Sequence, residues 1–174
     1  AHAIHFRAPY TTNVDFRKAV NAGEINYTDI HLSQVAQRLR SGFLGHVTTA
    51  IIEACELTAD GRIYLTAGVG ISPTIARLAD RVIVELNAAH SKSLIGVHDL
   101  YEMERPPYRR PIPIVRPSDR IGLPYIQVDP AKIVGVVEVN LPDEARGFHD
   151  PDPVTDKIGQ NVADFLAADM RRGI

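Results

Sequence analysis

Residues 47–87 read VTTAIIEACELTADGRIYLTAGVGISPTIARLADRVIVELN, and this stretch decides the fold. Its two apolar runs, 47–54 and 82–87, have the length and the β-branched composition of largely buried strands. The Asp60-Gly61 pair between them favours a tight turn, which predicts a hairpin with a further strand over 62–66. A hairpin within an alternation of strands and helices predicts an α/β layered domain whose sheet is mixed and mostly parallel.

The junction over residues 67–75 predicts the start of a helix after this hairpin. Ser72 has the residue type of an N-cap, and Pro73 suits the first helical position. The free N–H groups of a helix start attract an anion, and Gly68 and Gly70 would let a ligand approach the backbone closely. The alternative is a turn that only reverses the chain, because two glycines without the rest of a nucleotide-binding motif are weak evidence.

The flanking segments continue the same alternation of strands and helices. Toward the N-terminus we expect a short helix over 15–21, and then a second helix that Thr28 or Asp29 caps. Toward the C-terminus we expect another buried strand over 133–139 and a last helix that begins at Pro153. All these elements fit one α/β domain over residues 1–174.

Residues 105–117 stand apart, because they contain five prolines and four arginines. Proline cannot donate to a sheet ladder, so this run is excluded from a central strand and is expected to be an extended surface segment. Its arginines suit either phosphate binding or a plain cationic surface. Tyr108 is its single aromatic residue, so the stacking pattern of a nucleic-acid binder is missing.

The composition excludes several classes of protein. With 45% hydrophobic residues and a formal net charge of −2, the chain suits a folded domain and has no long-range attraction for nucleic acid or an anionic membrane. The single cysteine excludes a disulfide framework, and it suits a reducing cytoplasm, which is the compartment we predict. No apolar run reaches bilayer length. His2 and His5 lack a third ligand at a defined spacing, so no metal site is predicted.

The sequence contains candidate catalytic residues but no complete catalytic motif. Ser72 with His98 and Asp99 would need the fold to bring them together, and the chain has no nucleophile-elbow motif. Carboxylates on or beside apolar strands, such as Glu53, could act as a base or a nucleophile, although strand-end carboxylates more often face water or pair with arginine. The residues alone therefore predict an α/β domain with a candidate anion-binding loop, a plain turn being the alternative, and no complete active site.

An ordered set of segments covering nearly the whole chain resembles the acetyl-CoA hydrolase/transferase family of CoA-transferases. Taken in chain order, these segments are Phe6–Tyr10, Asn21–Glu24, His31–Ala36, Ala59–Gly61, Gly68–Ser72, Ala79–Asn87, Gly96–Asp99 and Pro113–Arg116. The resemblance implies a CoA-transferase-like fold in which this chain is part of the N-terminal of two domains. It also implies that the catalytic glutamate belongs to the second domain, so no catalytic residue is assigned here.

The activity implied by the resemblance is acyl-CoA:carboxylate CoA transfer, or acetyl-CoA hydrolysis, through a glutamyl-CoA thioester. Coenzyme A would then be a substrate, with no separate cofactor, and the partners would be acyl-CoA, a small carboxylate and the second domain, with homo-oligomerisation left open. The residues expected to line the substrate cleft are Thr11, Thr12, Asn13, Gly68, Gly70 and Ser72. A stand-alone, non-catalytic module that binds CoA or small carboxylates is the alternative.

Overall fold

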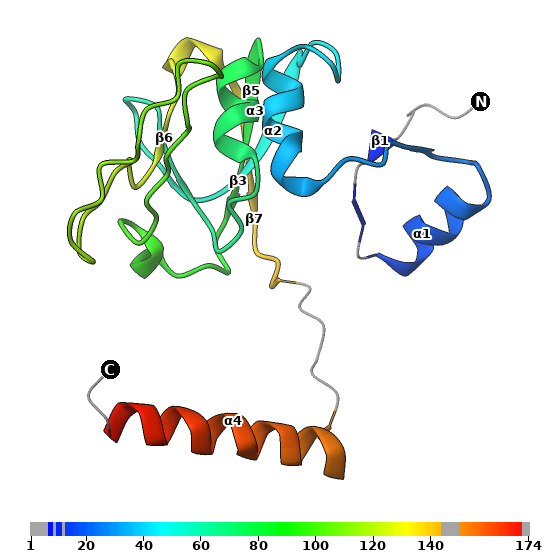
Figure 1. The fold of residues 1–174 in the computed structure, drawn as a ribbon. Coiled ribbons are helices and arrows are strands. Elements are labelled where there is room, and N and C mark those ends of the chain that lie inside the picture. Colours follow the sequence, from blue (N-terminus) through cyan, green and yellow to red (C-terminus); the bar gives the residue numbers. More distant parts are fainter. Residues whose placement is uncertain (1–6, 9, 12, 144–149, 172–174) are drawn as a thin grey trace. The chain divides into compact units, whose positions relative to one another are not determined.

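The computed structural model describes residues 7–8, 10–11, 13–143 and 150–171. The chain divides into two compact units, Ala1–Pro142 and Asp143–Ile174. The first unit contains two sheets, and the second contains one long helix (Figure 1). No helix in the described ranges combines the length and the apolar content needed to cross a membrane.

A small two-stranded parallel sheet forms near the N-terminus. Its strands are β1 (Arg7–Ala8) and β2 (Asn26–Tyr27), and α1 (Val14–Asn21) lies between them in the chain. The predicted helix over 15–21 is thereby confirmed. Asn13 caps it, because its side-chain oxygen accepts hydrogen bonds from the first backbone amides of α1.

The main sheet has five strands in the spatial order β6-β4-β3-β5-β7. The strands are β3 (Thr49–Leu57), β4 (Arg62–Leu65), β5 (Arg81–Asn87), β6 (Ile126–Gln127) and β7 (Ile133–Val139). The three longest strands, β3, β5 and β7, run parallel, whereas β4 and β6 are antiparallel to their neighbours. The sheet is therefore mixed and mostly parallel, and the hairpin between β3 and β4 is confirmed.

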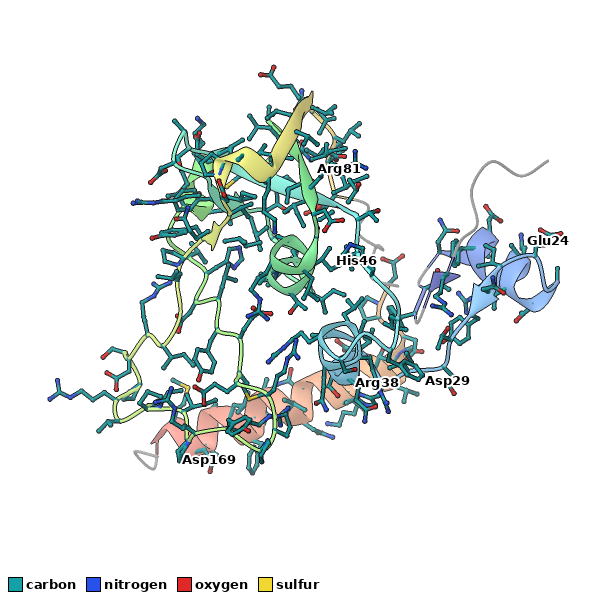
Figure 2. All side chains as sticks on the ribbon, turned by 90° about the horizontal axis from the view of Figure 1, so that it is seen from above. Glu24, Asp29, Arg38, His46, Arg81 and Asp169 are labelled. Carbon is teal, nitrogen blue, oxygen red and sulfur yellow. The ribbon has the colours of Figure 1, made fainter. Side chains whose placement is uncertain are left out.

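Two helices that pack against each other precede and follow the hairpin. They are α2 (Leu32–Arg40) and α3 (Ser72–Leu78), which lie side by side in Figure 1 and are seen almost end-on in Figure 2. Buried residues of α3 join one face of the sheet in a single apolar core. That core consists of Ala50, Ile52, Ala54, Ile63, Leu65, Ala76, Ala79, Val82, Val84, Ile126 and Val128.

Two expectations about helix caps are wrong. His31, rather than Thr28 or Asp29, is the N-cap of α2, and its Nδ1 accepts from the backbone amide of Ser33. Ser72 does not cap α3, because the helix already includes it and the N-cap position belongs to Ile71. A cap is decided by where the backbone leaves the helical region, which residue type alone does not fix.

The strand over 133–139 exists, but it is not buried. It is β7, at one edge of the sheet, and Val134, Val136 and Val137 are each about half exposed. An apolar run of seven residues looks the same whether its strand lies at the centre or at the edge, so the pattern could not settle burial. Ile51 of β3, two strands from β7 in the sheet, is also exposed.

The proline and arginine segment is irregular, as predicted. It belongs to a long connection from η1 (Lys92–Leu94) to β6, in which Leu100 and Leu123 form an isolated antiparallel bridge. A single 3₁₀ turn, η2 (Pro130–Lys132), capped by Asp129, then leads into β7.

The second unit contains α4 (Pro153–Arg171). Its predicted beginning is confirmed, because Asp152 Oδ1 accepts from the amides of Val154 and Thr155 at 2.9 and 2.8 Å. The exposed side chains of this helix include the apolar stripe Val154, Ile158, Val162, Phe165 and Leu166.

Candidate functional site

Polar side chains converge on Glu53, in the middle of β3, close to the sheet edge where the neighbouring parallel strand β5 ends. Glu53 of β3 accepts hydrogen bonds from Thr66 Oγ1 at 2.8 Å and from Asn87 Nδ2 at 2.7 Å. Thr66 directly follows β4, and Asn87 ends β5; both are almost fully buried. Ligands of open α/β sheets bind beyond this edge, so the cluster lies at the edge where a site is expected.

The cluster also fixes the loops that leave this edge. Asn87 Oδ1 accepts from the amides of Ala89 and Leu141, and its Nδ2 also donates to the Leu141 carbonyl. His98 Nε2 donates to the Thr66 carbonyl at 2.7 Å. Three connections, following β4, β5 and β7, are thus joined through two buried side chains and one carboxylate.

The environment of Glu53 keeps it ionised. Burial by itself would raise its pKa, but the hydrogen bonds from Asn87 and Thr66, together with the nearby His90, outweigh burial and lower the pKa below its ordinary value. The Glu53 Oε1 to His90 Nε2 distance is 3.5 Å. A carboxylate held this way is a stable anion that orders its donors, and it is a poor base.

The loop after Thr66 brings the backbone into an open position. Gly70 has φ +49°, which favours glycine, and a Cβ added at Gly68 or Gly70 would meet nothing within 4 Å. Gly68 and Gly70 are exposed, whereas Ser72 is half-buried, with its amide bonded to the Val69 carbonyl. The expected close approach of a ligand to this backbone therefore has the space that it needs.

A cavity of about 310 Å³ lies beside Gly70. Its walls come from α2, from the start of α3 and from residues 99–103 with Arg109. A second cavity of about 210 Å³ shares Gln37, Arg40 and Arg109 with the first and also includes Glu104. Of the predicted substrate-binding residues that the structure describes, Gly70 alone lines the larger cavity.

The remaining predicted residues are placed elsewhere or outside the description. Asn13 caps α1, and Thr11 Oγ1 accepts from the Asn13 amide at 3.2 Å, so both organise the start of that helix. Thr12 lies outside the described residues, as do His2 and His5. Substrate contact by Thr11, Thr12 and Asn13 stays a prediction.

The structure does not join Ser72, His98 and Asp99 into a triad. His98 Nε2 donates to the Thr66 carbonyl. Asp99 accepts hydrogen bonds from the amides of Ile121 and Gly122, and these bonds lower its pKa. Within the described ranges no hydrogen bond connects Ser72 to either side chain.

Sequence reasoning missed the convergence of Thr66 and Asn87 on Glu53. The signal that could have found it is the position of polar residues at the ends of neighbouring apolar strands. Arg40 was also missed, because a polar helix face normally contacts only water. Arg105 and Arg109, which line the cavities as well, belong to the segment whose arginines were considered for phosphate binding.

Comparison with known proteins places these observations in a family. The model of the acetyl-CoA hydrolase/transferase N-terminal domain matches residues 1–138. A propanoyl-CoA:succinate CoA transferase of Escherichia coli is 42% identical over 173 residues, and a succinyl-CoA:acetate CoA-transferase of Clostridium kluyveri is 40% identical. An acetyl-CoA hydrolase of Schizosaccharomyces pombe is 38% identical over 176 residues.

These relatives are much longer than the present sequence. The alignments cover 99%, 99% and 98% of this chain, but 35%, 32% and 34% of the E. coli, C. kluyveri and S. pombe proteins, respectively. Among solved structures, RipA from Yersinia pestis matches 92% of this chain and 32% of its own, with a TM-score of 0.56 and 18% identity. That likeness concerns the fold alone.

Proposed function

We propose, from the premise that this chain belongs to the acetyl-CoA hydrolase/transferase family, that it forms part of an enzyme that transfers CoA between carboxylates or hydrolyses acyl-CoA. The match of the N-terminal domain model to residues 1–138 is the observation that carries this proposal. The chain spans about a third of the curated relatives that it matches, so the activity belongs to a longer polypeptide. We assign this part to the N-terminal CoA-transferase domain.

The proposed chemistry uses a glutamate outside this chain. Its carboxylate attacks the thioester carbonyl and displaces CoA thiolate, which leaves an acyl-glutamyl anhydride. The thiolate then attacks the glutamyl carbonyl, releases the acyl group as a carboxylate and forms a glutamyl-CoA thioester. An acceptor carboxylate reverses these steps to form a new acyl-CoA, or water hydrolyses the thioester and frees CoA. Splitting one exchange in this way is covalent catalysis.

The part of this chain is to bind and orient. The exposed backbone at Gly68 and Gly70 and the cavity beside it are where we place substrate contact. The Glu53 cluster fixes the start of that loop, because Thr66, which donates to Glu53, directly precedes it. Glu53 itself is not proposed as the nucleophile, because its hydrogen bonds and lowered pKa make its carboxylate a weak one.

The test is an assay of the natural full-length protein with acetyl-CoA, propanoyl-CoA and succinyl-CoA. Each donor is supplied with acetate or succinate as acceptor and also without acceptor, and the new acyl-CoA and free thiol are measured separately. New acyl-CoA identifies transfer, and thiol release without acceptor identifies hydrolysis. The 174-residue chain is assayed in parallel and is expected to be inactive.

Two results would contradict the proposal. Acyl transfer or hydrolysis by the 174-residue chain would place a nucleophile inside it. A full-length protein that binds CoA or short carboxylates in calorimetry, yet processes none of these donors, would favour the stand-alone binding module instead.

A further inference from the structure

We propose that the cavity beside Gly70 is an oxyanion subsite in which Arg40 and Arg109 bind a carboxylate or phosphate group of a substrate. This inference rests on the proposed function for the identity of the ligand, although the geometry that supports it is independent of the reaction. The glycine loop has no charged side chain for binding an anion. Arg40 of α2 and Arg109 of the proline and arginine segment would supply that positive charge.

One helix face and one loop form the subsite. Ser33, Gln37 and Arg40 are spaced i, i+4 and i+7 on α2, so they share a face, and all three line the larger cavity. Arg109 lies opposite them on the loop and is tied to that face, because its Nη2 donates to Gln37 Oε1 at 3.1 Å. Gly70 lines the same cavity, so a group bound there would touch the open backbone.

Neither arginine has a carboxylate partner within the described ranges. Arg40 Nη1 donates to the Met103 carbonyl at 2.7 Å, and Arg109 Nε donates to the Glu104 carbonyl at 3.3 Å. With the amide oxygen of Gln37, these are all neutral acceptors. No carboxylate of the described residues therefore pairs with either guanidinium beside the cavity.

The acidic side chains around the cavity are compensated by groups other than these arginines. Glu102 pairs with Arg77 at 3.1 Å and accepts from the Thr74 hydroxyl. Glu104 pairs with Arg110 at 2.5 Å. Asp99 accepts from two backbone amides, as described above. Each of these acidic side chains thus has partners other than Arg40 and Arg109, which leaves both guanidiniums available to an oxyanion.

Arg40 also has an orphaned donor. Its Nε is shielded from solvent and has no hydrogen-bond partner among the residues that the structure describes. Burying an unsatisfied N–H is costly, so such a group is expected to have an acceptor in the functional state. A planar guanidinium offers Nε and Nη2 as a two-pronged donor, which matches the oxygens of a carboxylate or a phosphate.

The volume limits what can bind. About 310 Å³ is at the lower end of small-molecule sites and suits a short carboxylate or one phosphate group, not a whole CoA molecule. Two sources of the same oxyanion chemistry remain, the acceptor carboxylate and a phosphate of CoA. They are separated by which substrate loses affinity when the arginine is removed.

The experiment compares the full-length protein with its Arg40→Met and Arg109→Met variants. Arg38→Met is the matched control, because Arg38 belongs to the same helix (Figure 2). Its guanidinium stacks on the Phe43 ring at 5.0 Å, and it lines neither cavity. KM and kcat are measured for acetate and succinate, for acyl-CoA, and for the corresponding acyl-pantetheine, which has no phosphate. Circular dichroism verifies the fold of each variant.

Loss of one charge-assisted contact is expected to raise one KM about 10- to 100-fold in both test variants, with kcat changed much less. A higher KM for the acceptor identifies a carboxylate as the ligand. A higher KM for acyl-CoA, without one for acyl-pantetheine, identifies a phosphate. If every KM of the folded variants stays within twofold of the Arg38→Met control, the subsite is refuted and Arg40 only ties the loop to α2.

A second readout separates this inference from the proposed function. Inorganic phosphate and succinate are titrated calorimetrically into the full-length protein and into the variants. If the protein turns over no acyl-CoA, the proposed function fails, and binding that Arg40→Met or Arg109→Met abolishes still supports the subsite. Absence of binding in the wild-type protein, or equal binding in the variants, overturns it. If Arg40→Met does not fold, Arg109→Met, on the exposed loop, decides.

Discussion

Replacing Glu53 with alanine should destabilise the first unit more than any other removal of a partly exposed carboxylate in it. The side chain is 37% exposed, yet both of its hydrogen-bond donors, Thr66 and Asn87, are at most 2% exposed. Water cannot reach them fully once the carboxylate is gone. Alanine therefore leaves the Thr66 hydroxyl and one N–H of Asn87 without acceptors.

The magnitude follows from these two donors. A buried donor left unsatisfied costs about 1–3 kcal/mol, and the Asn87 amide keeps its second bond, to the Leu141 carbonyl. Because Glu53 is partly exposed, water entering the vacated space compensates for part of the loss. We expect the free energy of unfolding to fall by about 2–4 kcal/mol, a large share of the roughly 5–15 kcal/mol that stabilises a typical domain.

The assay is urea denaturation of the wild-type chain and its variants at pH 7. Glu85→Ala is the control, because Glu85 is the cross-strand partner of Glu53 on the same face and makes no side-chain hydrogen bond within the described ranges. Its loss is expected to change the free energy of unfolding by less than about 0.5 kcal/mol. Glu53→Gln, which can still accept from Asn87 and contact the Thr66 hydroxyl, should lie between the two.

The pH dependence of the free energy of unfolding tests the contribution of the Glu53 charge. Because the folded-state pKa of Glu53 is lowered, its ionised form contributes stability that is present above the ordinary value of 4.5 and is lost as the pH falls through the folded pKa. The stability gap between wild type and Glu53→Gln should accordingly narrow below about pH 4.5. Equal stabilities of Glu53→Ala and Glu85→Ala at pH 7, or a gap unchanged in acid, would refute this reasoning.

Three further predictions concern the turn, the cysteine and the last helix. Gly61→Ala should lower the free energy of unfolding in urea by about 2–4 kcal/mol, because Gly61 has φ +80° and a Cβ would collide with the Val128 carbonyl. Gly42→Ala is the control: Gly42 has φ +78° but open space around it, so only the backbone strain remains, about 1–2 kcal/mol. Cys55 is the single cysteine, and burial raises the pKa of its thiol, so Ellman's reagent should react with it in denaturant and hardly at all in the native chain. Asp152→Ala should destabilise α4 by about 1 kcal/mol and lower the helical circular dichroism signal, whereas Asp152→Asn keeps the cap and should not.

The main strands and the hairpin turn could be predicted because their signals are local. The Asp60-Gly61 pair and the apolar runs on either side of it are contiguous in the sequence, and Gly61 adopts the positive φ that such a turn needs. The start of α4 could be predicted for the same reason, because its cap Asp152 and its first residue Pro153 are adjacent in the sequence.

The candidate site was less predictable, since it depends on distant residues. Glu53 meets Thr66 and Asn87 across 13 and 34 positions, and Arg109 reaches Gln37 across 72. No spacing rule links such residues before the sheet order is known. The Gly70 loop was found because glycine and helix-start signals are local. The arginines beside it come from α2 and from the proline and arginine segment, and the sequence could not show that these two segments meet at the loop.

The most direct test of the central claim is to locate the covalent intermediate. The full-length protein is incubated with acetyl-CoA, quenched and digested, and the peptides are searched by mass spectrometry for CoA attached to a glutamate. We predict the adduct on a glutamate outside these 174 residues. An adduct on a glutamate within them, such as Glu53, would contradict the proposal that this chain binds and orients substrate while another domain supplies the nucleophile.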